Sequence, residues 1–84
     1  MARYFFHFKD GVTLLDDTGT EFADIHAARS GAVTASGEML RDGASASLWD
    51  GHPWKLWVTD QPNGAGTTFF TLHFSALQGA EATS

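Results

Sequence analysis

The sequence contains no cysteine, so neither disulfide bonds nor thiolate metal ligands can stabilise this chain of 84 residues. Basic residues are also scarce: ten acidic side chains against five Lys and Arg give a formal net charge of −5. A field of this sign repels phosphate backbones and anionic lipids. We therefore do not expect nucleic acid as a partner.

Long apolar runs and known catalytic motifs are missing as well. No segment is long enough to span a bilayer, and the first residues lack the basic and apolar regions of a signal peptide. We expect no membrane association and a cytoplasmic location. Because there is also no Gly-x-Ser-x-Gly motif and no phosphate-binding glycine loop, the sequence predicts no cofactor and offers no catalytic residue.

Aromatic residues are abundant, with seven Phe, three Trp and one Tyr. They alternate with other residues in segments 3–8, 54–59 and 68–74, and this period of two is typical of β-strands. Residues 12–15 follow a Lys-Asp-Gly turn and form a predicted return strand. Residues 20–22 are predicted to be a short extended piece that leads into a helix.

The segment 24–43 is the one stretch with sustained helical periodicity. Asp24 is a typical N-cap residue, and Gly43 is the predicted left-handed residue at the C-terminal end. The apolar stripe contains Ile25, Ala28, Ala32, Ala35 and Met39. Two interior glycines weaken the helix, so we expect it to pack against the sheet rather than to be stable alone.

Together these elements predict an α+β fold in a single small domain. The predicted order is ββαββ, with a four-stranded, largely antiparallel sheet and one main helix on one face. The domain is expected to cover residues 1–78, and residues 79–84 to be a frayed C-terminal tail. Residues 44–49 are consistent either with a single helical turn or with a loop.

Three blocks carry a resemblance to a known family. They are Arg3-Tyr4-Phe5-Phe6-His7-Phe8, then Glu38-Met39-Leu40-Arg41-Asp42, then Trp54-Lys55-Leu56-Trp57-Val58-Thr59-Asp60 with Phe70-Thr71-Leu72-His73-Phe74-Ser75-Ala76. The chain resembles a family of short bacterial proteins that share a domain of unknown function. The resemblance implies a compact ββαββ-type domain and no catalytic or ligand residue. The loop 61–66 is longer than the usual hairpin turn of the family, which affects the register of the last strand.

A single helix about 10 Å wide covers only one face of four strands spaced about 4.8 Å apart. Strand alternation assigns the following residues to the helix side: Tyr4, Phe6, Phe8, Leu56, Val58, Phe70, Leu72 and Phe74. The opposite face would then expose three large aromatic rings together. The candidate interaction face consists of Phe5, His7, Lys55, Trp57, Phe69 and His73.

Three interpretations of this face compete. Leu48, Trp49 and the loops could fold over it. It could bind a protein partner or a second copy, since Trp and Phe are common anchors of interfaces. It could also stack the bases of a single-stranded nucleic acid, although the acidic charge opposes this. We predict a non-enzymatic protein-association module that binds a protein partner or forms a homodimer through this face.

The alternative is a small metal-dependent or carboxylate enzyme. His7 and His73 would approach each other if the first and last strands pair, but there is no ligand motif, and we assign no metal site. Asp17-Thr18-Gly19 resembles the active-site turn of dimeric aspartic proteases. However, Asp16 stands where those proteins have an apolar residue, and the matching downstream strand is missing. An ordinary solvated turn is the preferred interpretation of this segment.

Overall fold

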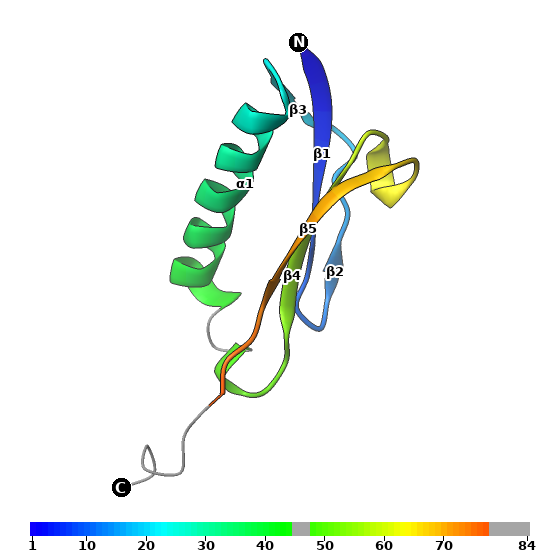
Figure 1. The fold of residues 1–84 in the computed structure, drawn as a ribbon. Coiled ribbons are helices and arrows are strands. Elements are labelled where there is room, and N and C mark those ends of the chain that lie inside the picture. The colour runs from blue at the N-terminus through cyan, green and yellow to red at the C-terminus, as the bar shows by residue number, and fades with distance from the viewer. Residues whose placement is uncertain (45–47, 78–84) are drawn as a thin grey trace, which may run out of the picture.

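The computed structural model describes residues 1–44 and 48–77. The predicted tail and the centre of segment 44–49 lie outside the described residues. Six regular elements form the fold, shown in Figure 1: β1 (Ala2–Lys9), β2 (Thr13–Leu14), β3 (Thr20–Phe22), α1 (Ile25–Met39), β4 (Trp54–Thr59) and β5 (Thr68–Phe74). A π-helix, η1 (Leu40–Ala44), and a 3-10 helix, η2 (Pro62–Gly64), complete the elements.

The sheet is antiparallel, with the order β2-β1-β4-β5, and β3 pairs with β1 as a fifth strand. The α+β class with one main helix is confirmed, whereas the predicted four strands and ββαββ order are only approximate. The difference is β3, the segment expected to be a short extended piece leading into the helix. It pairs with β1 at Ala2–Tyr4, while β2 pairs at Phe8 and Lys9.

The helix begins where the sequence predicts. The Asp24 side chain accepts a hydrogen bond from the Ala27 N–H at 2.9 Å, which satisfies one of the free donors of the first turn. The end of the helix differs from the prediction. Instead of stopping at Gly43, the chain widens into the π-helix η1. No described helix is both long and apolar enough to cross a membrane.

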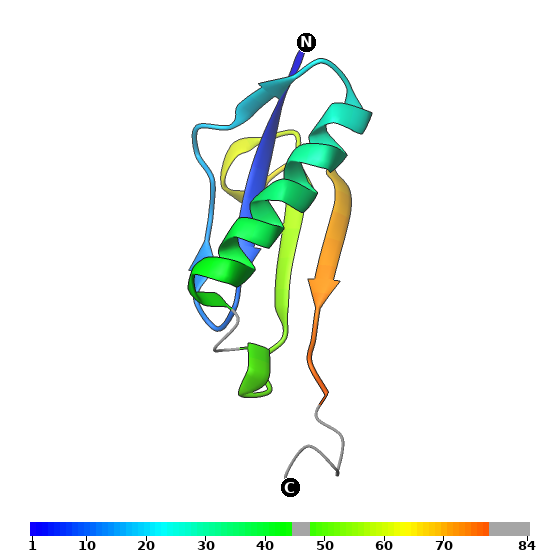
Figure 2. The ribbon, with the colours of Figure 1, turned by 90° about the vertical axis from the view of Figure 1, so that its left-hand side faces the viewer.

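The core lies between α1 and one face of the sheet, and Figure 2 shows the helix lying across that face. Ala28 and Ala32 of the helix are fully buried there, because their small side chains let the helix approach the strands closely. The predicted helix-side residues are confirmed: Tyr4, Leu56 and Val58 belong to the buried cluster, and Phe6, Phe8, Phe70, Leu72 and Phe74 pack against it. Trp54 and Leu48 join the same core.

A β-bulge in β5 places Phe69 on the helix side of the sheet instead of the predicted opposite face. Val58 pairs with Phe70 and Thr59 pairs with Thr68, so Phe69 is an extra residue without a partner in β4. The Phe69 ring lies 5.4 Å from the ring of Tyr4, which belongs to the helix-side core. The alternation of β5 therefore fails at Phe69, because the bulge breaks the period of two.

The two glycines inside α1 provide a first test of this packing. A Cβ atom on Gly31 would lie 2.7 Å from Cζ of Phe22, whereas one on Gly37 would meet nothing within 4 Å. We expect Gly37→Ala to raise the free energy of unfolding by about 0.5–1 kcal/mol, through helix propensity alone. We expect Gly31→Ala to be less stable than Gly37→Ala by at least about 1 kcal/mol.

The reason is that the Phe22 ring cannot move away freely. It stacks on Phe6 with 5.7 Å between ring centroids and meets Tyr4 edge-on at 5.9 Å. Urea unfolding of the two variants and the wild type measures the difference. Equal stabilisation by both alanines would show that α1 does not pack on Phe22 as described.

Candidate functional site

The six residues of the candidate interaction face do not form one open surface. Phe5 is 7 % exposed and His7 is fully buried. Phe69 lies with Tyr4 on the helix side, so the expected exposed group of Phe5, Trp57 and Phe69 is wrong. What remains on the face opposite α1, which we call the helix-free face, is Trp57 with Lys55 and His73.

Local segments cover Phe5 and His7. A Cβ atom on Gly19 would lie 2.8 Å from the Phe5 ring, so the turn at Gly19 passes directly over that ring. On the other side, Asn63 of η2 donates its N–H to the Asp16 carbonyl at 2.9 Å. This contact joins the turn to the loop before β5. Covering by loops, one of the three interpretations of this face, thus applies to Phe5 and His7, whereas Leu48 packs into the helix-side core.

His7 is the centre of a buried hydrogen-bond chain. Its Nδ1 accepts the N–H of Asp16 at 3.0 Å, which leaves Nε2 as the protonated nitrogen of a neutral ring. Nε2 lies 2.8 Å from Oγ1 of Thr59, which donates to the Gln61 carbonyl at 2.6 Å. Because Thr59 is also fully buried, the chain is shielded from water. It connects β1, β4 and the turn after β2.

Asp16 occupies the gap between the two short strands that share one edge of β1. Its Oδ2 accepts the Phe6 N–H at 3.1 Å, at the position where neither β2 nor β3 provides a carbonyl. Its Oδ1 accepts the N–H groups of Thr18 and Gly19, each at 3.0 Å. A side chain therefore replaces a strand at this point of the ladder and also closes the turn that follows.

Both titratable groups are shifted by these surroundings. Burial lowers the pKa of His7 below its usual 6.5, against a smaller opposing attraction from the Asp16 carboxylate. Burial alone would raise the pKa of Asp16. The hydrogen bonds from Gly19, Thr18 and Phe6, together with His7, outweigh it and lower that pKa below 3.8. At neutral pH His7 is thus uncharged and Asp16 is ionised.

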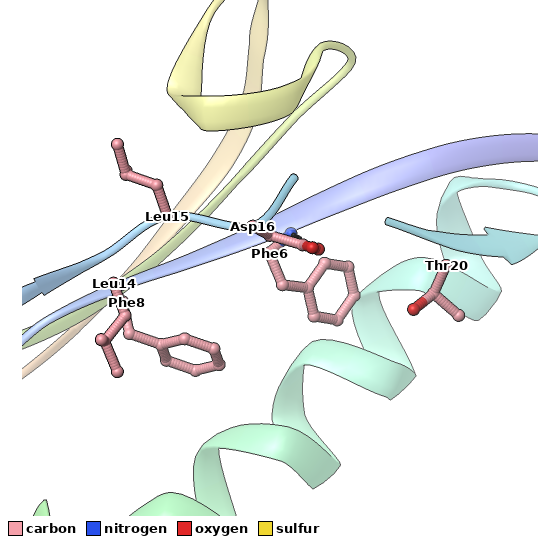
Figure 3. Close-up of a pocket in the computed structure, with 6 residues that line it drawn as sticks. All are labelled: Phe6, Phe8, Leu14, Leu15, Asp16 and Thr20. Carbon is pink, nitrogen blue, oxygen red and sulfur yellow. Dashed lines mark hydrogen bonds between the residues drawn. The ribbon is translucent and has the colours of Figure 1, made fainter. Parts of the chain in front are cut away.

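A cleft of about 350 Å³ lies beside this network, and Figure 3 shows the residues that line it. They are Phe6, Phe8, Leu14, Leu15, Asp16 and Thr20. The Phe6 and Phe8 rings point toward the helix, whereas Leu15 points the other way. The carboxylate of Asp16 is the one charged group in the lining, and backbone donors already occupy it. The cleft therefore contains no free acid or base for catalysis.

The other predicted chemistry is not assembled either. His7 and His73 do not lie on paired strands, because β4 separates β1 from β5. Within residues 1–44 and 48–77, no group of three His, Asp or Glu side chains could hold a metal ion. Asp17 is exposed, and its Oδ1 accepts the Thr18 hydroxyl at 3.1 Å. The turn is ordinary, but Asp16 in it is held by backbone donors rather than solvated.

Sequence reasoning missed Asp16 and Thr59 as the partners of His7. The one available signal was the spacing Asp16-x-x-Gly19, which is typical of an aspartate that closes its own turn. Nothing in the sequence linked that turn to a histidine nine residues earlier or to a threonine on another strand. Such contacts depend on strand order.

Comparison with known proteins gives a family and no activity. A family described as a domain of unknown function (DUF6894) matches residues 3–75. No curated protein and no solved structure matches the chain. The geometry therefore has to supply any functional hypothesis.

The role of Asp16 is tested by removing one acceptor. In Asp16→Asn an amide NH₂ replaces one carboxylate oxygen, so in either orientation of the amide it meets backbone donors that it cannot accept, Phe6 on one side or Thr18 and Gly19 on the other. We expect a loss of about 1–3 kcal/mol in the free energy of unfolding, because a half-buried donor is left unpaired. The neighbouring Asp17→Asn is the control and should change stability by less than about 0.5 kcal/mol. Chemical denaturation measures both, and equal effects would contradict the capping role.

The lowered pKa of His7 predicts a pH dependence with a definite sign. In the unfolded chain His7 binds a proton near 6.5, whereas in the folded protein it does so only at lower pH. Stability from neutral His7 is therefore complete above pH 6.5 and is lost as the pH falls toward the folded pKa. The pKa of Asp16 is lowered below 3.8, so Asp16 does not contribute to the change near pH 6.5.

His7→Gln isolates this contribution, because glutamine keeps a donor and an acceptor but does not titrate. We expect denaturation curves between pH 8 and pH 5 to lose stability more steeply in the wild type than in His7→Gln. His26, His52 and His73 are present in both proteins, so their effects cancel. Parallel curves for the two proteins would show that His7 titrates normally in the folded state.

Proposed function

The chain belongs to the family described as a domain of unknown function (DUF6894), and we propose that it is a non-enzymatic protein-association module that forms a homodimer by pairing β5 with β5 of a second copy. The observation that carries the proposal is the open edge of β5. The family resemblance and the lack of cysteine further support a bacterial protein of the cytoplasm.

The outer edge of β5 has the properties that proteins usually avoid on a free edge. Among the described residues, β5 pairs only with β4, so one row of its N–H and C=O groups has no strand partner. The strand is seven residues long and contains no proline, Lys, Arg, Asp or Glu. Exposed edges without charge, proline or cover pair readily with another strand. Pairing would satisfy these backbone groups.

A second copy fits this edge because β5 is self-complementary. A two-fold axis at Thr71 would place Phe70 opposite Leu72 of the partner subunit and keep each apolar residue on the helix side. Phe70, Leu72 and Phe74 are only half-buried in one chain, so pairing would remove more of their surface from water. No like charges would oppose each other across the axis.

Four of the six residues of the candidate interaction face lie on or next to the proposed interface. Phe69, with 44 % of its surface exposed, and His73 belong to the pairing strand itself. Lys55 and Trp57 lie on β4, directly beside it. Phe5 and His7 are buried under the covering turn, so they support the sheet from inside. The proposed interface is therefore the β5 edge rather than the centre of the helix-free face.

Charge placed at the axis should separate the dimer. We expect the wild type to sediment as a dimer at high micromolar concentration, and Thr71→Lys to shift toward monomer, because two ammonium groups would then face each other. Thr34→Lys, at an exposed position of α1, adds the same charge elsewhere and should leave the mass unchanged. A wild type that stays monomeric at this concentration would refute the homodimer.

Because the chain has no cysteine, one introduced thiol reports the register. Side chains opposite each other in an antiparallel pair have Cβ atoms about 4.5–5.5 Å apart, close enough for a disulfide after small adjustments. Thr71→Cys should therefore form a covalent dimer on mild oxidation, and Thr34→Cys should not. Dimers in sedimentation without cross-linking at residue 71 would leave association standing but show a different register.

A further inference from the structure

The two lysines of this acidic chain lie side by side on the sheet. Lys9 of β1 is directly opposite Lys55 of β4, and Lys55 is directly opposite His73 of β5. Strand alternation puts all three on the helix-free face, where they form a row across three neighbouring strands. We call Lys9, Lys55 and His73 the basic row. Like charges in directly opposite positions destabilise a sheet, so this arrangement calls for a compensating anion.

No acidic side chain supplies that compensation in the described part of the chain. Its ion pairs involve arginines only, Arg3 with Glu21 and Arg41 with Asp42. Asp10, next in sequence to Lys9, has its Oδ1 3.4 Å from the Val12 N–H in its own turn. Lys55 instead places its Nζ 4.8 Å from the centroid of the Trp57 ring, a cation–π contact that orients the ammonium group.

The basic row borders a hollow of about 240 Å³. The lining consists of Lys9, Gly11, Pro53, Trp54, Lys55 and His73. Gly11 keeps one side open, since a Cβ atom there would meet nothing within 4 Å. The hollow is thus lined by the two lysines and the histidine of the basic row together with a glycine, a proline and a tryptophan.

We propose that this hollow binds a small phosphate monoester through the basic row. A phosphate dianion carries two charges and three acceptor oxygens, which match two ammonium groups and an imidazole N–H better than a single carboxylate does. The net charge of −5 does not prevent this. At physiological salt the Debye length is about 8 Å, so the nearest charges dominate inside the hollow. Two lysines are too few to hold a long nucleic-acid backbone.

The test uses inorganic phosphate and glycerol phosphate, titrated into ¹⁵N-labelled protein at constant ionic strength with sodium chloride as balance. We expect saturable shifts of the amide signals of Lys9, Lys55 and His73 with both probes. Lys55→Gln and Lys9→Gln should each weaken binding by about tenfold or more, as expected for loss of a charged hydrogen bond. Arg29→Gln is the control, because it removes one exposed positive charge from α1 and should change binding less than about twofold.

Three results would overturn the proposal. One is a linear response to phosphate no larger than the response to chloride. Another is an equal loss of binding in Arg29→Gln and Lys55→Gln, which would indicate net charge rather than a site. The last is saturable binding of a single-stranded oligonucleotide without binding of either phosphate probe. Circular dichroism of each variant verifies that it is folded, and Lys9→Arg should retain binding because it keeps the charge.

Discussion

The middle of the sheet depends on the hydrogen bond from the Phe6 N–H to the Asp16 carboxylate. β1 is the central strand, and β4 pairs along one of its edges from Phe5 to Lys9. The other edge is shared by two short strands that leave a gap, and the half-buried Phe6 N–H in that gap would cost free energy if it stayed unpaired. Asp16 fills the gap, and its own N–H is held in turn by His7. One residue therefore joins the split edge to the buried network on the helix-free face.

Local periodicity is sufficient for most of the fold. The sequence alone predicts the bounds of β3, β4 and β5 as the structure has them, and it predicts Asp24 as the N-cap. These features depend on a few neighbouring residues, since alternation and capping act over one turn or one strand. The same alternation identifies the helix-side core. The pairing of β3 with β1 was missed because three residues are too few to show the alternation that indicates a paired strand.

The exposure of the candidate site residues was less predictable than the sheet face on which they lie. It depends on which loops and side chains cover each residue, and alternation does not show these. Alternation places His7 on the helix-free face, but it does not show that the turn at Asp16, the hydroxyl of Thr59 and the Trp57 ring surround the imidazole there. The prediction that Phe69 lies on the helix-free face fails for a different reason. The bulge within β5 adds one unpaired residue, and a single insertion moves a side chain to the other face.

The two outer sides of the sheet are consequently unequal. On the β1 side the outermost strands, β2 and β3, are only two and three residues long, whereas on the other side the described chain leaves the seven-residue β5 without a partner strand at its outer edge. A two-fold axis perpendicular to the sheet would keep each face on its own side. Pairing through β5 would thus bring two basic rows onto one continuous face, at equal distances from Thr71. Because strand pairing uses backbone groups and anion binding uses side chains of that face, occupancy of one site leaves the other accessible.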